Sequence, residues 1–149
     1  MTTFTTSTTT PSPSVAAPEP KTRTGNAKQL WKTGAVAGVA AAALTTAFAA
    51  AVEALGVSLK IDGEAIPLLG FAQMVILGTI IGTALAVVLA RKASHPRRTF
   101  VITTVALTAL TFVPDITANA PGGTRLALAL SHVVAAAIVI PALASKLSD

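Results

Sequence analysis

Five side chains with charge or hydrogen-bonding capacity interrupt or border the long apolar stretches of this chain: Glu53, Gln73, Asp115, Arg125 and His132. A charged group inside an apolar layer is costly, so it usually faces the protein and finds a partner there. A histidine near carboxylates can also change its charge near neutral pH, which suits proton transfer. These five residues therefore form the predicted polar cluster of the chain.

Within this cluster the spacing predicts an ion pair between Asp115 and Arg125, which flank a short turn. Glu53 and His132 would add hydrogen bonds to it. We favour a structural clamp of helix ends, because all of these groups fall within roughly 9 Å of one end of their stretches. A proton or solute site that uses Glu53, Asp115 and His132 is the alternative. A metal site is disfavoured because one imidazole with oxygen ligands is a weak metal signal, and we expect no bound metal or cofactor.

One face of the third apolar stretch carries polar side chains at helical spacing. Intervals of four, three and four residues separate Thr104, Thr108, Thr111 and Asp115. Residues three and four apart are neighbours on a helix surface, so the four side chains share one stripe. Arg125 and His132, seven residues apart, share a face of the fourth stretch in the same way. We expect these two stripes to meet.

Signatures of catalysis are missing from the sequence. It contains no His-Glu-x-x-His, Gly-x-Ser-x-Gly or Gly-x-x-x-x-Gly-Lys-Ser/Thr motif, and it has no cysteine. Ser131 and His132 are adjacent and would point about 100° apart on a helix, so they cannot form a nucleophile and base pair. We therefore expect no catalytic residues and no enzyme activity.

Long apolar stretches must position these residues, and there are four of them: Gly34 to Val57, Leu68 to Ala90, Thr99 to Thr117 and Leu126 to Ser145. At 1.5 Å per residue they cover roughly 28 to 36 Å, which matches a hydrocarbon core of about 30 Å. The predicted fold class is all-α, an integral membrane bundle of four transmembrane helices formed by residues 30–146. Contact with the lipid bilayer follows from this fold.

The basic residues gather on one side of the predicted spans. Nine flank the start of the first span, the loop between the second and third, and the end of the fourth: Lys21, Arg23, Lys28, Lys32, Arg91, Lys92, Arg97, Arg98 and Lys146. Lys60 and Arg125 are the two on the other side. By the positive-inside rule both termini are cytoplasmic, and the expected location is the plasma membrane. This arrangement explains the net charge of +5 without a nucleic-acid partner.

The first 29 residues are rich in threonine, serine and proline, and they hold too little apolar surface to offset the entropy of ordering. We predict a disordered cytoplasmic tail. An alternative is a cleaved signal peptide with a charged region at Lys28 to Lys32, an apolar core at 35–47 and a cleavage site at 47–49. This alternative is disfavoured, because the segment ahead is long and the apolar run continues past the site.

Two connections have recognisable turn chemistry. Apolar and polar residues alternate around Asp62-Gly63 between the first two spans, which predicts a small β-hairpin with a type I′ turn in the first extracytoplasmic loop. A plain polar loop is the alternative. Residues 118–124 contain Pro121-Gly122-Gly123, a tight turn that makes spans three and four antiparallel neighbours.

Glycines spaced four apart suggest close helix contacts. Gly34 and Gly38 on the first span and Gly78 and Gly82 on the second have the Gly-x-x-x-Gly spacing of membrane helix interfaces. These faces would meet within one chain or in a homo-oligomer. Protein partners other than a second copy are not indicated.

Several motifs in their order resemble an actinobacterial family of short four-span membrane proteins of unknown function. The motifs are Leu30-Trp31-Lys32-x-Gly34, Ile66-Pro67-Leu68-Leu69-Gly70-Phe71-Ala72-Gln73, Val113-Pro114-Asp115, and Thr124-Arg125 followed by His132, Ala135-Ala136 and Ile140-Pro141. The resemblance covers about residues 30 to 146. It implies an actinobacterial plasma-membrane protein and no particular activity. We expect a structural or accessory membrane component, with a small oligomeric transporter or channel subunit as the alternative.

Overall fold

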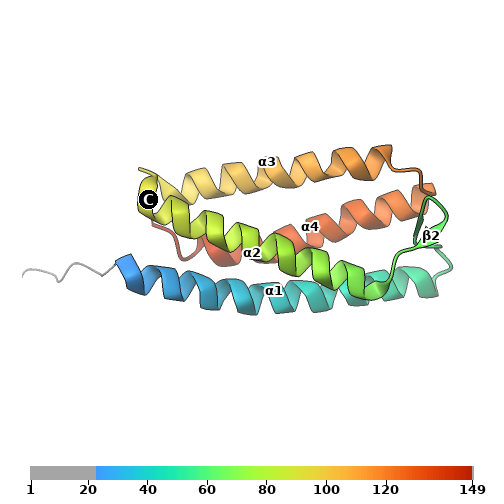
Figure 1. Cartoon of the computed structure of the whole chain (residues 1–149), viewed down its shortest axis with the longest axis horizontal. Coiled ribbons are helices and arrows are strands. Elements are labelled where there is room, and N and C mark those ends of the chain that lie inside the picture. The colour runs from blue at the N-terminus through green and yellow to red at the C-terminus, as the bar shows by residue number, and fades with distance from the viewer. Residues whose placement is uncertain (1–22, 149) are drawn as a thin grey trace, which may run out of the picture.

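The computed structural model describes residues 23–148 as a bundle of four long helices (Figure 1). The helices are α1 (Arg23–Ala54), α2 (Leu68–Lys92), α3 (Pro96–Thr117) and α4 (Gly122–Ala144), and a hairpin of β1 (Lys60–Ile61) and β2 (Glu64–Ala65) joins the first two. All four are long and apolar enough to cross a membrane. The predicted fold class and hairpin are confirmed. Helix α1 begins inside the segment predicted to be a tail, and the rest of that segment, residues 1–22, lies outside the described residues.

Prolines mark the starts of three helices. Pro67 immediately precedes α2, Pro96 is the first residue of α3, and Pro121 immediately precedes α4. Proline has no backbone N–H and a fixed φ near −65°, so it fits a helix start and ends whatever precedes it. Helices satisfy most of their backbone groups internally, which a chain surrounded by lipid requires. The exceptions are at Pro114 in α3 and Pro141 in α4, which lack the backbone N–H.

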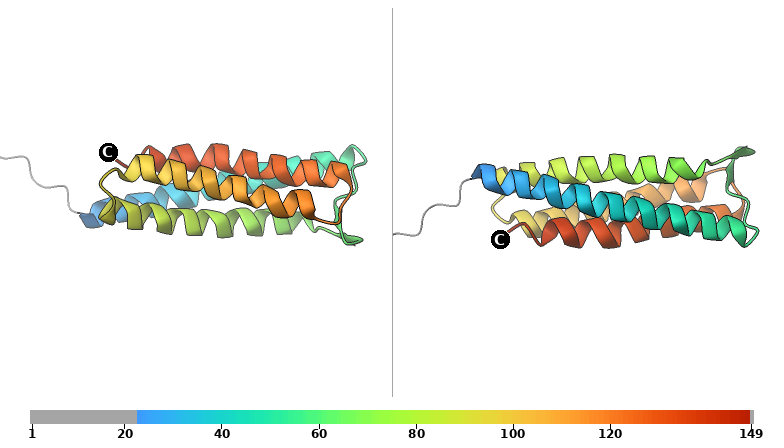
Figure 2. Two further views of the ribbon diagram at one scale, coloured as in Figure 1. Left: turned by 90° about the horizontal axis from the view of Figure 1, so that it is seen from above. Right: turned by 90° about the horizontal axis from the view of Figure 1, so that it is seen from below.

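The helices run antiparallel in chain order around the bundle (Figures 1 and 2). Helix α1 packs against α2 and α4, whereas α3 packs against α4 and, less extensively, α2. The start of α1, the α2–α3 loop and the end of α4 lie at one end, and the hairpin and the α3–α4 loop lie at the other. The basic residues assigned to one side of the membrane, from Lys28 onward, therefore do belong to one end of the bundle.

Helices α1 and α2 approach closely because α1 presents glycine at the contact. A Cβ added at Gly34 would collide with the hydroxyl oxygen of Thr83, and one added at Gly38 would lie 2.9 Å from Cγ2 of Thr79. Both threonines are buried. Lipid tails are as apolar as leucine, so membrane helices associate through close packing of their backbones. Small residues at the contact permit that close approach.

The second glycine pair has a different position. Nothing lies within 4 Å of a Cβ built at Gly78 or Gly82, so these two glycines do not form the contact with α1. Since Gly34 and Gly38 are buried inside one chain, they are not free to form an interface between chains. The predicted homo-oligomer contact would depend on Gly78 and Gly82 alone.

Two apolar cores hold the bundle, and α3 contributes to only one of them. The core near the α2–α3 loop unites all four helices through Leu30, Ala86, Phe100, Leu143, Ala144 and Leu147. The core under the hairpin contains Ala49, Leu59, Phe71 and Ala127, from α1, the hairpin segment, α2 and α4. Helix α3 is therefore anchored by its first turns, and toward the hairpin it diverges from α2 (Figure 1).

The hairpin caps this second core. Asp62 and Gly63 have φ of 54° and 85°, the positive values that both central residues of a type I′ turn need. Leu59 is only 2% exposed, so the segment is anchored in the bundle as well as paired with itself. The Thr124 hydroxyl donates to the Ser58 carbonyl at 2.7 Å, which ties the hairpin to the first turn of α4. This anchoring supplies the stability that two short strands alone would lack in water.

Candidate functional site

Two of the five residues in the predicted polar cluster come together. His132 Nδ1 on α4 lies 3.1 Å from Asp115 Oδ2 on α3. Asp115 is buried at 8% exposure, and His132 is half-buried. The other three, Glu53, Gln73 and Arg125, are exposed, and among residues 27–148 neither Glu53 nor Arg125 forms an ion pair.

The predicted ion pair between Asp115 and Arg125 is wrong, because the two helices do not begin and end at the same depth. Asp115 lies two residues before the end of α3, whereas its partner His132 lies ten residues after the start of α4. At 1.5 Å per residue this places the start of α4 roughly 12 Å farther toward the hairpin than the end of α3. Figure 1 shows α4 extending past α3 at this end. Arg125 is consequently at the rim of the bundle.

The hydrogen on His132 can be placed from the neighbours of its ring. Nδ1 lies 3.0 Å from the Leu128 carbonyl oxygen as well as 3.1 Å from Asp115 Oδ2. A carbonyl oxygen only accepts hydrogen bonds, so the contact with Leu128 is a hydrogen bond when Nδ1 carries the hydrogen. That hydrogen is directed at Leu128, because Asp115 Oδ2 has no hydrogen bond of good geometry within the described residues. The Asp115 and His132 contact is thus a close electrostatic one that leaves a buried carboxylate oxygen unsatisfied.

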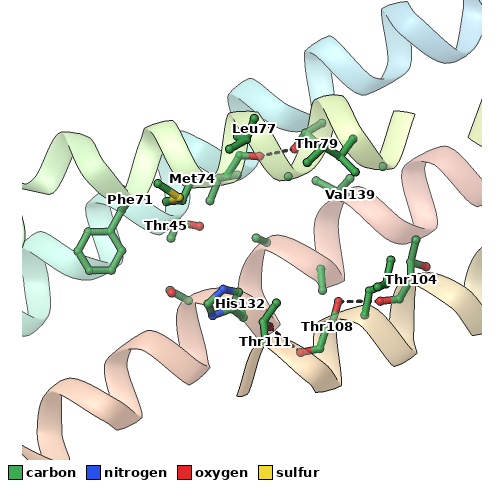
Figure 3. Close-up of a pocket in the computed structure, with 18 of the residues that line it drawn as sticks. Thr45, Phe71, Met74, Leu77, Thr79, Thr104, Thr108, Thr111, His132 and Val139 are labelled. Atoms are coloured by element: carbon green, nitrogen blue, oxygen red, sulfur yellow. Dashed lines mark hydrogen bonds between the residues drawn. The ribbon is translucent and has the colours of Figure 1, made fainter. Parts of the chain in front are cut away.

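Both residues line a groove of about 600 Å³ between α2 and α3. Exposed side chains form its rim, with Met74, Leu77 and Ile81 on α2 and Leu107 on α3. Buried side chains from α1 and α4, including Thr45 and Ser131, form its floor. In Figure 3 the α2 residues face His132 and the α3 threonines across the groove, with Thr45 between them. The groove therefore opens sideways between two candidate spans.

The ends of the groove are closed by apolar side chains. Ile61 and Ile66 of the hairpin segment line one end, and Phe100, which is 1% exposed, lines the other. Asp115 lies toward the hairpin end. From Phe100 to Asp115 the α3 wall is roughly 22 Å long at 1.5 Å per residue.

The predicted polar stripe of α3 runs along this wall. Thr104, Thr108, Thr111 and Asp115 all line the groove. Each threonine hydroxyl donates to a backbone carbonyl of its own helix, at 2.7, 2.9 and 2.6 Å in chain order. Thr79 of α2 and Ser131 of α4 do the same at 2.7 Å. These hydroxyls have used their hydrogens and offer only lone pairs to the groove.

Two features of the site escaped the sequence reasoning. The groove depends on the divergence of α3 from α2, which no local pattern encodes, although Gly78 and Gly82 border it and leave it unfilled. Thr45 is 1% exposed, and its hydroxyl has no hydrogen-bond partner among the described residues. A threonine in the alanine-rich first helix was the sequence feature that could have indicated this position. In the same part of the chain, no three histidine, aspartate or glutamate side chains gather as metal ligands.

The fold and this site define a class: a four-helix candidate membrane protein with a lateral groove and one buried acid beside a histidine. The model of a family of unknown function, DUF6069, matches residues 25–149, and the chain belongs to that family. No curated protein and no solved structure matches the chain.

Proposed function

We propose that the protein is a non-catalytic accessory component of the actinobacterial plasma membrane that holds an apolar membrane ligand in the groove between α2 and α3. The observation that carries this proposal is the groove itself, with a buried acid at one end of an otherwise apolar and hydroxyl-lined wall. Volumes of about 300 to 1,000 Å³ with a few polar groups are typical of ligand sites. If the helices span a bilayer, the groove faces acyl chains.

The experiment is native mass spectrometry of the full chain purified gently from its own membranes. We expect a bound small molecule of lipid type that is lost in the double variant Gly78→Leu/Gly82→Leu. Both glycines border the groove, and a Cβ added at either would meet no atom within 4 Å, so the larger side chains have room to enter the groove.

The matched control is Ala84→Leu, an exposed position on α2 outside the groove lining, which should retain the molecule. Equal retention by the groove-filling variant and the control would refute the proposal.

The orientation proposed for this function places both termini and the α2–α3 loop in the cytoplasm. The chain has no cysteine, so single-cysteine variants can be labelled without background. In intact cells a membrane-impermeant maleimide should label Glu64→Cys, in the exposed hairpin, and should label Ser94→Cys, in the exposed α2–α3 loop, only after lysis. The reverse pattern would place the basic end of the bundle outside.

A small transporter subunit remains the second candidate, favoured by the 3.1 Å contact between Asp115 and His132 within two candidate spans. Paired ionisable groups at membrane depth are typical of proton relays. In proteoliposomes with an imposed pH gradient, this function predicts proton flux that disappears in Asp115→Asn at unchanged protein content. No flux above that of empty liposomes would exclude it.

A further inference from the structure

The polar groups of the groove share a chemical bias toward accepting hydrogen bonds. The hydroxyls of Thr79, Thr104, Thr108, Thr111 and Ser131 donate to carbonyls of their own helices and leave only lone pairs. The hydrogen on His132 Nδ1 is directed at Leu128, and in the neutral ring Nε2 is an acceptor. The carboxylate form of Asp115 has only acceptor oxygens. Of the hydroxyl groups that line the groove, that of Thr45 has no hydrogen-bond partner among the described residues.

One of these acceptors lacks a donor. Oδ2 of Asp115 is buried and has no hydrogen bond of good geometry within the described residues. A buried unsatisfied acceptor costs free energy, and more when it is charged. The Asp115 carboxyl group lines the groove, so a ligand that donates a hydrogen bond to this group lowers that cost. The arginine of the predicted cluster, Arg125, is exposed and forms no ion pair within residues 27–148.

From this lining we propose, resting on the proposed function, that the groove binds a single-chain aliphatic amine or its ammonium form. The head would lie at the hairpin end, where its N–H groups donate to Asp115 and to the hydroxyl oxygens beside it. The tail would run along the roughly 22 Å wall toward Phe100. The groove walls beyond the polar stripe are apolar and suit such a chain.

The shape of the groove suits a single chain. Its volume is about 600 Å³, and it opens sideways between α2 and α3. A single alkyl chain fits that volume. Anionic head groups are disfavoured, because they also present acceptor oxygens and would face the acceptor oxygens and the carboxyl group of the wall.

Binding can be tested with the full chain in nanodiscs of zwitterionic lipid, using dodecylamine, dodecyltrimethylammonium, dodecanol and dodecanoate as probes. We expect dodecylamine to bind at least about tenfold more tightly than dodecanoate, as a charge-assisted hydrogen bond implies. Dodecylamine should also bind more tightly than dodecyltrimethylammonium, which carries the charge without an N–H donor.

Asp115→Asn should remove the preference for the amine. Glu53→Gln makes the same change in charge at an exposed position near the same end of the bundle, and it should leave the preference intact. If Asp115→Asn fails to fold, the order of the four probes on the unaltered chain still decides the question.

Two results would overturn the inference, and they are distinguishable. Equal binding of all four probes, with all displaced by Gly78→Leu/Gly82→Leu, would refute the amine specificity while the groove remains a ligand site. Binding unaffected by the groove-filling variant, or a second protein chain found in the groove, would refute both the inference and the proposed function.

Discussion

Gly34→Leu should prevent the bundle from assembling. The first added carbon already collides with the Thr83 hydroxyl and lies 3.1 Å from its Cγ2, so α1 and α2 must separate along their closest contact. Overpacking of this kind costs about 3 kcal/mol, and the helix-propensity gain on replacing glycine, about 1 kcal/mol, does not offset it. In a membrane no hydrophobic drive between helices compensates the lost packing.

The measurement is the fraction of folded protein and its melting temperature in mild detergent, compared with Gly82→Leu. That control introduces the same residue on the neighbouring helix, at a position where an added Cβ has no atom within 4 Å. We expect the control to accumulate and melt near the parent chain. Equal behaviour of the two variants would mean that α1 and α2 do not meet at Gly34.

His132→Leu is expected to be the next most damaging change, because it removes the ion-pair partner that the buried Asp115 has within residues 27–148. Removing one member of a buried pair costs about 3 to 5 kcal/mol, and we expect about 2 to 3 kcal/mol here because 38% of the His132 side chain is exposed. The double variant Asp115→Leu/His132→Leu should recover much of the loss, since no charge remains buried.

The damage should be local to the end of α3. That part of the helix contributes nothing to the core under the hairpin, and Asp115 and the edge-on Phe112 ring both contact His132 on α4. In His132→Leu, hydrogen exchange should accelerate over residues 108–117 and should accelerate less over residues 30–50. Arg125→Leu removes an exposed charge that forms no ion pair within residues 27–148, and it should change the free energy of unfolding by less than about 0.5 kcal/mol. A larger effect of Arg125→Leu than of His132→Leu would restore the pair predicted from spacing.

The sequence predicted the parts of this fold that depend on local chemistry. Hydropathy located the four helices because bilayer thickness fixes their length, and Asp62-Gly63 located the hairpin because both positions need positive φ. The threonine stripe of α3 followed from helical spacing. Each of these features is determined within a few residues of itself.

Relations between helices could not be predicted in this way. Spacing places Asp115 on the inner face of α3, but whether it meets Arg125 or His132 depends on the relative depth of two helices, which packing decides. Likewise the Gly-x-x-x-Gly pattern identified small faces and not their partners: Gly34 and Gly38 meet threonines, whereas Gly78 and Gly82 border the groove. The groove arises where α3 leaves α2, and no residue pattern indicates a divergence.

The most direct test of the ligand groove is to locate an adduct. A dodecylamine with a photoreactive group in its chain would be irradiated with the full chain in nanodiscs, and the adducts would be mapped by peptide mass spectrometry. We predict adducts on groove residues such as Met74, Leu77, Leu107 and Thr108, competed by excess dodecylamine. Adducts spread equally over exposed faces that turn away from the groove, such as Val39 and Leu110, would contradict a specific site between α2 and α3.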